Sequence, residues 1–131
     1  AGLPMSLDEV QVDSLVPASL AALTRTHFLQ RLHEADADMA ERHGRAAAAG
    51  KVLRYVARLD AQGRASVGLA EVDRAHAFAN LRLTDNIVQF TTRRYADNPL
   101  VVQGPGAGPE VTAAGVFADL LRVSSSLGAQ V

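Results

Sequence analysis

The stretch KVLRYVARLDAQGRASVGLAEVD, residues 51–73, decides the fold class because its side chains alternate with a period of two. In its first half one face carries Leu53, Tyr55, Ala57 and Leu59, and the other face carries valines and arginines. The turn residues DAQGR separate this half from ASVGLAEVD, a pattern typical of a β-hairpin with one mixed face. The sequence therefore predicts antiparallel sheet at its centre.

A long helix is predicted directly before the hairpin, from Ser19 to about Ala49. Apolar residues recur there at steps of three and four, which gives a helix one face to bury against a core. Acidic residues precede arginines by four positions, the favourable orientation for ion pairs on an exposed surface. The helix is expected to end at Gly50. Its predicted apolar face consists of Phe28, Leu32, Ala35, Met39 and Ala46.

Further strands are predicted on both sides of these elements. A short strand or extended connection precedes Pro17, and the segments NIVQFTT from Asn86 and LVVQG from Leu100 follow the hairpin. The LVVQG segment is almost continuously apolar, which predicts a strand buried on both faces. We therefore predict an α+β fold in which the long helix packs on one face of a mixed sheet. The strands of this sheet are expected near Val10, Leu53, Val67, Val88 and Val101.

The clearest helix start follows the segment GPGAGP, residues 104–109. Gly108 is expected to precede the helix, Pro109 suits its first position, and Glu110 places a negative charge where the helix dipole favours one. An apolar stripe follows in the next turns, so this C-terminal helix also has a face to bury. The stripe consists of Val116, Leu120, Val123 and Leu127.

The composition excludes several classes of protein. Of the 131 residues, 48% are hydrophobic and 21% are charged, as in an ordinary globular domain. Thirteen basic residues balance fourteen acidic ones and aromatic residues are few, so nucleic acid is not an expected partner. No apolar run is long enough to span a membrane. Cysteine is absent, which removes thiolate chemistry and fits a reducing cytoplasm, the location that we predict.

No residues have the spacing of a metal site or of a known catalytic motif. Three histidines of the long helix point in different directions, and His76 stands apart from them. The acidic residues between positions 34 and 41 alternate around the helix and are expected to form a solvated face. The sequence contains no Walker loop, no serine-hydrolase elbow and no zinc-protease motif. A metal site is therefore not expected.

The glycine-rich segment at residues 104–108 indicates a different kind of site. Its glycines have the spacing Gly-x-Gly-x-Gly, whereas the dinucleotide-binding fingerprint is Gly-x-Gly-x-x-Gly followed by a further βαβ unit. The spacing therefore favours a tight turn from strand to helix, with a phosphate-binding loop as the alternative. Glycines before a helix N-terminus expose backbone N–H groups that a polar ligand group can approach.

Several segments, in the same order, resemble the C-terminal part of homoserine dehydrogenase. They are GKVLRYVARLD, VGLAEVD and DNIVQFTTRRYADNPLVVQGPGAGPEVTAAGVFADLLR, and together they cover at least residues 50–128. The end of the chain after VSSSLG looks most like that of the bifunctional aspartokinase/homoserine dehydrogenases. The resemblance implies an oxidoreductase that uses NADP or NAD to interconvert L-homoserine and L-aspartate 4-semialdehyde, in threonine and methionine biosynthesis.

The resemblance also implies a division of the chain. Residues 1–107 match the later part of the region that binds substrate and forms the homodimer, and residues 108–131 match a helix that returns to a nucleotide-binding Rossmann domain. That Rossmann domain and the catalytic lysine, with an aspartokinase in the bifunctional enzymes, are expected before Ala1. Lys51 does not match this lysine, so no catalytic residue is assigned. We expect an inactive fragment of the enzyme, beginning just after a helix.

The cofactor site that the resemblance implies is a loop closing over the nicotinamide. It assigns cofactor contacts to Gly106, Ala107 and Gly108, with Val111 and Thr112 as neighbours at the start of the helix. Two other functions stay open from the residues themselves. One is a non-catalytic module that self-associates through an exposed sheet face, and the other is a small nucleotide binder that depends on the glycine loop alone.

Overall fold

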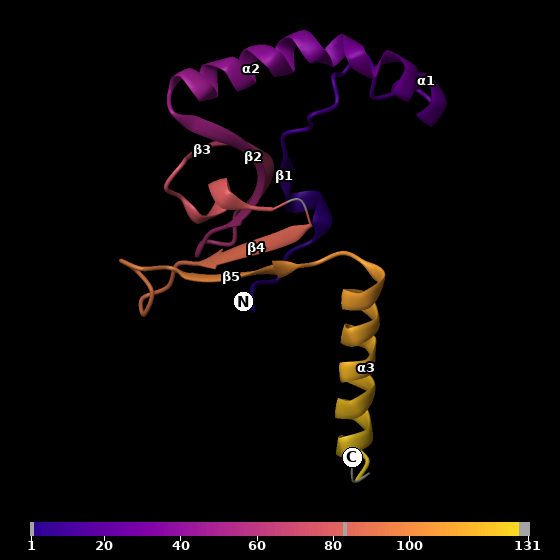
Figure 1. Cartoon of the computed structure of the whole chain (residues 1–131), viewed down its shortest axis with the longest axis vertical. Coiled ribbons are helices and arrows are strands. Elements are labelled where there is room, and N and C mark those ends of the chain that lie inside the picture. Colours follow the sequence, from indigo (N-terminus) through magenta and orange to yellow (C-terminus); the bar gives the residue numbers. More distant parts are fainter. Residues whose placement is uncertain (1, 83, 129–131) are drawn as a thin grey trace. The chain divides into compact units, whose positions relative to one another are not determined.

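The computed structural model describes residues 2–82 and 84–128, and the chain forms two compact units, Ala1–Ala79 and Asn80–Val131 (Figure 1). The fold is α+β, as predicted from the sequence. The first unit contains β1 (Gln11–Val12), α1 (Arg25–Arg31), α2 (Asp36–Ala48), β2 (Lys51–Leu59) and β3 (Ala65–Asp73). The second unit contains β4 (Asp85–Phe90), β5 (Leu100–Pro105) and α3 (Pro109–Ser126). Short 3-10 helices span Leu7–Glu9, Leu32–Ala35 and Ala77–Asn80.

The hairpin predicted at residues 51–73 is confirmed. β2 and β3 pair antiparallel along their whole length, from Lys51 opposite Asp73 to Leu59 opposite Ala65. β1 joins the other edge of β3 and runs parallel to it. The first unit therefore contains a mixed sheet in the order β1-β3-β2.

Asp60 fixes the turn between β2 and β3. Its carboxylate accepts hydrogen bonds from the backbone N–H groups of Gln62 and Arg64, both at 2.9 Å, and from Arg64 Nε at 2.6 Å. These hydrogen bonds, above all the one from the Arg64 backbone, hold the pKa of Asp60 below its ordinary value. The DAQGR segment thus forms a turn that its own first residue closes.

Arg54 fixes the segment that follows β3. Its guanidinium donates to the Phe78 carbonyl from Nε at 2.8 Å and to the Ala79 carbonyl from Nη2 at 2.5 Å. A third hydrogen bond, from Nη1, reaches the carbonyl of Leu53 at 2.8 Å. Arg54 is half-buried, so these carbonyls receive a charged donor where water has limited access. A residue of the edge strand β2 thereby holds the 3-10 helix at the end of the first unit.

The long helix differs from the prediction in its start and in its continuity. The first helical residue is Arg25 rather than Ser19, and the 3-10 segment Leu32–Ala35 separates α1 from α2. Figure 1 shows the two helices following one another as a rod with this interruption. Apolar steps of three and four do not distinguish an α-helix from a short 3-10 segment, so the periodicity gave no sign of the interruption. The predicted end at Gly50 is confirmed, because α2 ends at Ala48.

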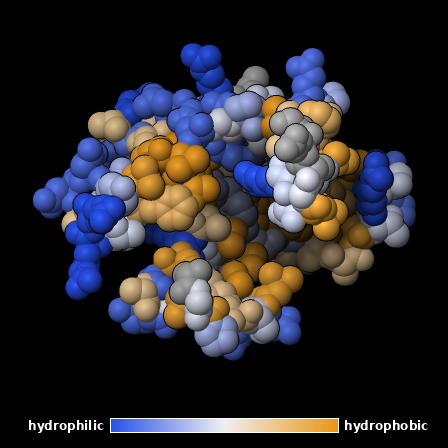
Figure 2. Space-filling model, turned by 90° about the horizontal axis from the view of Figure 1, so that it is seen from below, coloured by the Kyte–Doolittle hydropathy of each residue, from blue (hydrophilic) through white to orange (hydrophobic). Residues whose placement is uncertain are grey.

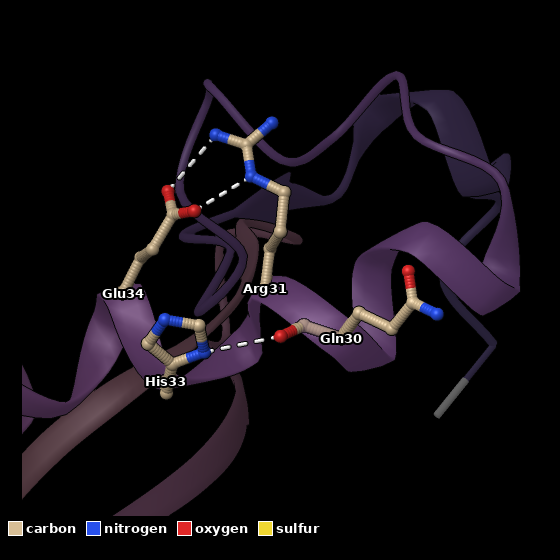
Figure 3. A network of polar contacts seen from close by, with 4 residues as sticks. All are labelled: Gln30, Arg31, His33 and Glu34. Atoms are coloured by element: carbon tan, nitrogen blue, oxygen red, sulfur yellow. Dashed lines mark hydrogen bonds and ion pairs between the residues drawn. The ribbon is translucent and has the colours of Figure 1, made fainter.

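A side-chain pair spans the 3-10 segment (Figure 3). Arg31 Nε donates to Glu34 Oε1 at 2.6 Å, and Arg31 Nη2 donates to Glu34 Oε2 at 3.0 Å. Side chains three residues apart lie above one another in a 3-10 helix, so this spacing suits the tighter turn. The hydrogen bond from Arg31 holds the pKa of Glu34 below its ordinary value. Beside this pair, His33 Nδ1 lies 3.0 Å from the carbonyl oxygen of Gln30.

The first unit has a small buried core. Its buried side chains are Leu20, which precedes α1, Ala46 on α2 and Val72 on β3. The face predicted for the long helix is confirmed in part, because Ala46 is buried and most of its other members are half-buried. Leu32 is exposed instead, at the start of the 3-10 segment.

The second unit contains its own two-stranded sheet. β4 and β5 pair antiparallel from Asp85 opposite Pro105 to Phe90 opposite Leu100. Both strands were predicted, but the expectation of one sheet from all five strands is wrong, because the described strands form two sheets. The expectation that β5 is buried on both faces is also wrong, since Leu100, Val101 and Val102 are exposed. An apolar strand becomes buried only where other layers cover both faces of its sheet.

α3 begins where the sequence predicted and projects away from β5 (Figure 1). Gly108 precedes it and Pro109 is its first residue, as expected. Its apolar residues Val116, Phe117, Leu120 and Val123 are 57–64% exposed, and the space-filling view shows apolar groups reaching the surface among hydrophilic ones (Figure 2). Among the described residues, no helix combines the length and the apolar character that crossing a membrane requires.

Candidate functional site

The predicted cofactor loop lies where β5 ends and α3 begins. The five predicted residues, Gly106, Ala107, Gly108, Val111 and Thr112, belong to one continuous exposed segment of the second unit. The backbone N–H of Gly106 donates to the carbonyl of Thr84, just before β4, at 3.2 Å. The loop is therefore fixed to the start of the neighbouring strand before the chain turns into the helix.

Gly108 is required by its backbone conformation. It has φ of 128° and ψ of 151°, a combination that is essentially restricted to glycine. Among the described residues, no atom beyond its chain neighbours lies within 4 Å of the position that a Cβ would occupy, so space is not the constraint at this residue. Its carbonyl accepts a hydrogen bond from the N–H of Thr112 at 3.1 Å. Gly108 thus turns the chain and accepts the first hydrogen bond of α3.

Gly106 is required for a different reason. A Cβ added to it would lie 1.4 Å from Asn86 Nδ2 and 2.6 Å from Asn86 Cγ. The Asn86 side chain, which extends from β4, therefore occupies the volume that any other residue at position 106 would fill. Gly104, two residues earlier, has nothing within 4 Å of such a Cβ. Glycine at position 106 lets the loop backbone approach a neighbouring side chain.

Sequence analysis did not identify Asn86 as part of this loop. The relevant signal was the pairing of the strands, which places Asn86 opposite Gly104 and therefore next to the glycine-rich segment. That register depends on tertiary structure, whereas the periodicity of NIVQFTT indicates only a strand. The geometry thus adds one side chain to the five predicted residues.

The start of α3 is better suited to a neutral polar group than to a phosphate. The first N–H groups of a helix lack partners within the helix and point toward solvent or a ligand. Pro109 supplies no N–H, and Glu110 adds a carboxylate in the first turn. This negative charge repels a phosphate at the place where the helix dipole would otherwise attract one. The loop can therefore contact and orient a ligand through its backbone groups.

The described residues contain no group of three histidine, aspartate or glutamate side chains arranged to hold a metal ion. Lys51, the single lysine in the sequence, lies at the start of β2 and its Nζ is 3.7 Å from Glu71 Oε2. This cross-strand ion pair gives Lys51 a place on the surface of the first sheet. The same sheet exposes Tyr55 and Leu59, so an apolar part of it is open in the first unit.

The comparisons with known proteins define the class to which this fold and loop belong. The sequence profile of the family "Homoserine dehydrogenase" matches residues 1–121. The chain therefore belongs to the homoserine dehydrogenase family, and the resemblance identified in the sequence is confirmed.

Relatives of two kinds match nearly the whole chain. It is 50% identical to "Bifunctional aspartokinase/homoserine dehydrogenase 2, chloroplastic" of Zea mays, over 98% of this chain and 14% of that protein. It is 46% identical to "Homoserine dehydrogenase" of Paracoccidioides brasiliensis (strain Pb18), over 97% of this chain and 35% of that protein. The chain thus spans about a seventh of the bifunctional relative and about a third of the other.

A solved structure supports the fold. The crystal structure of a protein of unknown function from Candida auris matches with a TM-score of 0.81 and 45% identity. The match covers 90% of this chain and 33% of that protein. The α+β arrangement is therefore shared with an experimentally determined structure.

Proposed function

We propose that this chain acts as part of a longer homoserine dehydrogenase, an NADP- or NAD-dependent oxidoreductase that interconverts L-homoserine and L-aspartate 4-semialdehyde. The observation that carries the proposal is the family match over residues 1–121. The relatives named homoserine dehydrogenase, at 46% identity over 97% of the chain, support the same activity. The chain matches only part of the length of these relatives, which supports the view that further domains are needed for turnover.

In this proposal, the loop of Gly106, Ala107 and Gly108 closes over the nicotinamide, and Val111 and Thr112 border it. The bound nicotinamide supplies the hydride chemistry, while the protein binds and orients the reactants. Two features of the loop fit that end of the cofactor: its glycine backbone allows close approach, and Glu110 disfavours a phosphate group. We assign no catalytic residue to these 131 residues.

The two parts of the chain have different roles in the proposal. Residues 1–107 belong to the region that binds substrate and forms a homodimer, and residues 108–131 belong to the nucleotide-binding domain. The exposed apolar residues of α3 support the second assignment, because such a face is stable in water only when another surface covers it. An aspartokinase domain in the same protein is proposed by analogy with the bifunctional relatives.

We also propose a cytoplasmic location for the whole protein. The cysteine-free sequence is compatible with a reducing compartment, and the chloroplast named for the plant relatives is the alternative. Imaging of the full-length protein with a fluorescent tag distinguishes these two locations.

The direct test compares the full-length protein with the isolated 131-residue chain. We expect the full-length protein to oxidise NADPH when L-aspartate 4-semialdehyde is added, and the isolated chain to show no turnover. Absorbance of NADPH at a fixed concentration of semialdehyde measures both. Absence of activity in a folded full-length protein, or turnover by the isolated chain, would contradict the proposal.

A non-catalytic self-association module is the second candidate, because Tyr55 and Leu59 expose apolar surface on the first sheet. Light scattering combined with NADPH titration of the full-length protein distinguishes it from the enzyme. A dimer that binds no nucleotide favours the module, whereas nucleotide binding favours the dehydrogenase. Saturable binding of NADPH by the isolated chain would instead favour a small nucleotide binder that depends on the glycine loop.

A further inference from the structure

The contact between Asn86 and Gly106 sets the shape of the loop at the start of α3. Asn86 Nδ2 stands 1.4 Å from the place of a Cβ on Gly106, and Asn86 Cβ stands 3.4 Å from it. The end of the side chain therefore makes the close contact with the loop backbone, while its Cβ lies at ordinary van der Waals distance. A methyl group at position 106 would require the Asn86 carboxamide to rotate away from the loop.

Asn86 is held on a fixed part of the second unit. It lies in β4, opposite Gly104 in β5, and the pair is flanked by Asp85 opposite Pro105 and Ile87 opposite Gln103. A hydrogen bond from Gln103 Nε2 to Asp85 Oδ2, at 2.9 Å, joins the two strands across the same region. The backbone of Asn86 is therefore fixed by the ladder, and its carboxamide is aimed at the loop.

The carboxamide of Asn86 is also accessible. Asn86 is exposed, and within the described residues no hydrogen bond involves its side chain. A carboxamide offers two N–H donors and a carbonyl acceptor. The contact with Gly106 is therefore one of packing, made by the carboxamide nitrogen and carbon.

We propose that Asn86 is a positioning residue of this enzyme: its carboxamide packs on Gly106 and thereby holds the loop of residues 106–108 in the conformation that closes over the nicotinamide. The inference rests on the proposed function for the identity of the ligand. Its structural part, the coupling of Asn86 to the loop, rests on the contact alone. Asn86 acts through the loop, and the reacting atoms are bound by other groups.

The test is a double-mutant cycle in the full-length protein, with N86A, G106A and the double variant N86A/G106A. In G106A the new methyl group takes the place of the Asn86 carboxamide, which must rotate away, so we expect the contact to be lost and KM for NADPH to rise several-fold. N86A alone removes the support of the loop and raises KM for NADPH several-fold, with a smaller effect on KM for the semialdehyde. Because both substitutions break the same contact, we expect the double variant to lose no more than either single variant.

G104A is the matched control, because a Cβ on Gly104 meets nothing within 4 Å. We expect its kinetic constants to stay within about twofold of the parent, as for a substitution that meets no neighbour. A double variant whose loss is the product of the two single losses, or a loss in G104A as large as in G106A, would overturn the proposal. Non-additivity is the decisive quantity, because residues that share no contact give additive effects.

Hydrogen exchange keeps this test separate from the test of function. The N–H of Gly106 donates to the Thr84 carbonyl, so its exchange reports the position of the loop without any substrate. We expect N86A to accelerate exchange in the peptide that contains position 106, and G104A to leave it unchanged. If the parent protein shows no dehydrogenase activity but N86A accelerates this exchange, the proposed function fails and the coupling stands. Unchanged exchange in N86A would refute the coupling, whatever the activity.

Discussion

The two units of the chain differ in how they bury their apolar residues. In the first unit Leu20, Ala46 and Val72 are buried, one each from a turn, a helix and a strand. In the second unit none of the described residues is buried, and α3 exposes a stripe of large apolar side chains. The first unit therefore supplies part of its own stabilisation, whereas the second presents surface that calls for a covering partner.

This difference fits our proposal that the second unit carries the cofactor loop. Ligand sites are often formed at the boundary between two domains, so a loop that closes over a ligand there needs the surface of the other domain to complete the site. The loop of residues 106–108 is ordered locally by the strand pairing before it, the Gly106 hydrogen bond and the start of α3. Its function in our account depends on what covers it.

The largest expected effect on stability comes from making the same substitution, leucine to alanine, in each of the two units. Leu20→Ala removes a buried side chain, and we expect it to lower the free energy of unfolding of the 131-residue chain by about 2–5 kcal/mol. Leu120→Ala removes the same atoms from an exposed face of α3, and we expect a change within about 0.5 kcal/mol. Urea unfolding followed by circular dichroism measures both. Equal losses in the two variants would contradict the comparison.

The next effect concerns the hydrogen bonds that hold the end of the first unit. Arg54→Met removes the donors to the Phe78 and Ala79 carbonyls, and we expect a loss of about 1.5–3 kcal/mol, typical of hydrogen bonds from a charged group. Arg58→Met is the control, since Arg58 lies exposed on the same strand. Its expected change is within about 0.5 kcal/mol in the same urea experiment. A loss in R58M as large as in R54M would refute the role of the hydrogen bonds.

A smaller effect is expected at the start of α3. Gly108→Ala places a side chain on a residue with φ of 128°, and we expect a local cost of about 1–2 kcal/mol. The cost frays the first turn of α3 and leaves the first unit unaffected. Hydrogen exchange resolved by peptide detects this as faster exchange after residue 108 alone. Unchanged exchange in that segment would show that the conformation of Gly108 is not a constraint.

The smallest effect is a dependence on pH in the first unit. The pKa of Glu34 is lowered by the hydrogen bond from Arg31, so its contribution to stability is present above the unfolded pKa and is lost as the pH falls through the folded pKa. We therefore expect Glu34→Gln to destabilise the chain slightly at pH 7, by an amount that vanishes at acid pH. Melting temperatures of the parent and E34Q between pH 7 and pH 3 measure this. A difference in melting temperature between the parent and E34Q that grows toward acid pH would contradict this expectation.

The parts of the fold that the sequence predicted are those that depend on local patterns. The hairpin of residues 51–73 has its alternation and its turn residues in one stretch, and the start of α3 has its glycine, proline and acidic residue in order. The interruption at Leu32–Ala35 and the separation of β4 and β5 into their own sheet were not predicted. Both depend on which surfaces meet in the folded chain, and a periodicity of apolar residues does not encode that choice.

In the candidate site, too, some residues were predicted from the sequence and one depends on tertiary structure. Gly106, Ala107, Gly108, Val111 and Thr112 were assigned by resemblance to a family, and the spacing of the glycines alone favoured a simple turn. Asn86 was not predicted, because its contact with Gly106 arises from the pairing of two strands whose register no motif reveals. The structure therefore shows which neighbour Gly106 approaches, which the spacing of the glycines alone did not reveal.

The most direct test of the account is hydrogen exchange of residues 106–112 in the full-length protein, with and without NADPH. Our account holds that this loop closes over the bound nicotinamide. We expect NADPH to slow exchange across this segment, with little change in the β2–β3 hairpin of the first unit. Saturating NADPH that leaves exchange of residues 106–112 unchanged, while protecting other parts of the protein, would contradict the account.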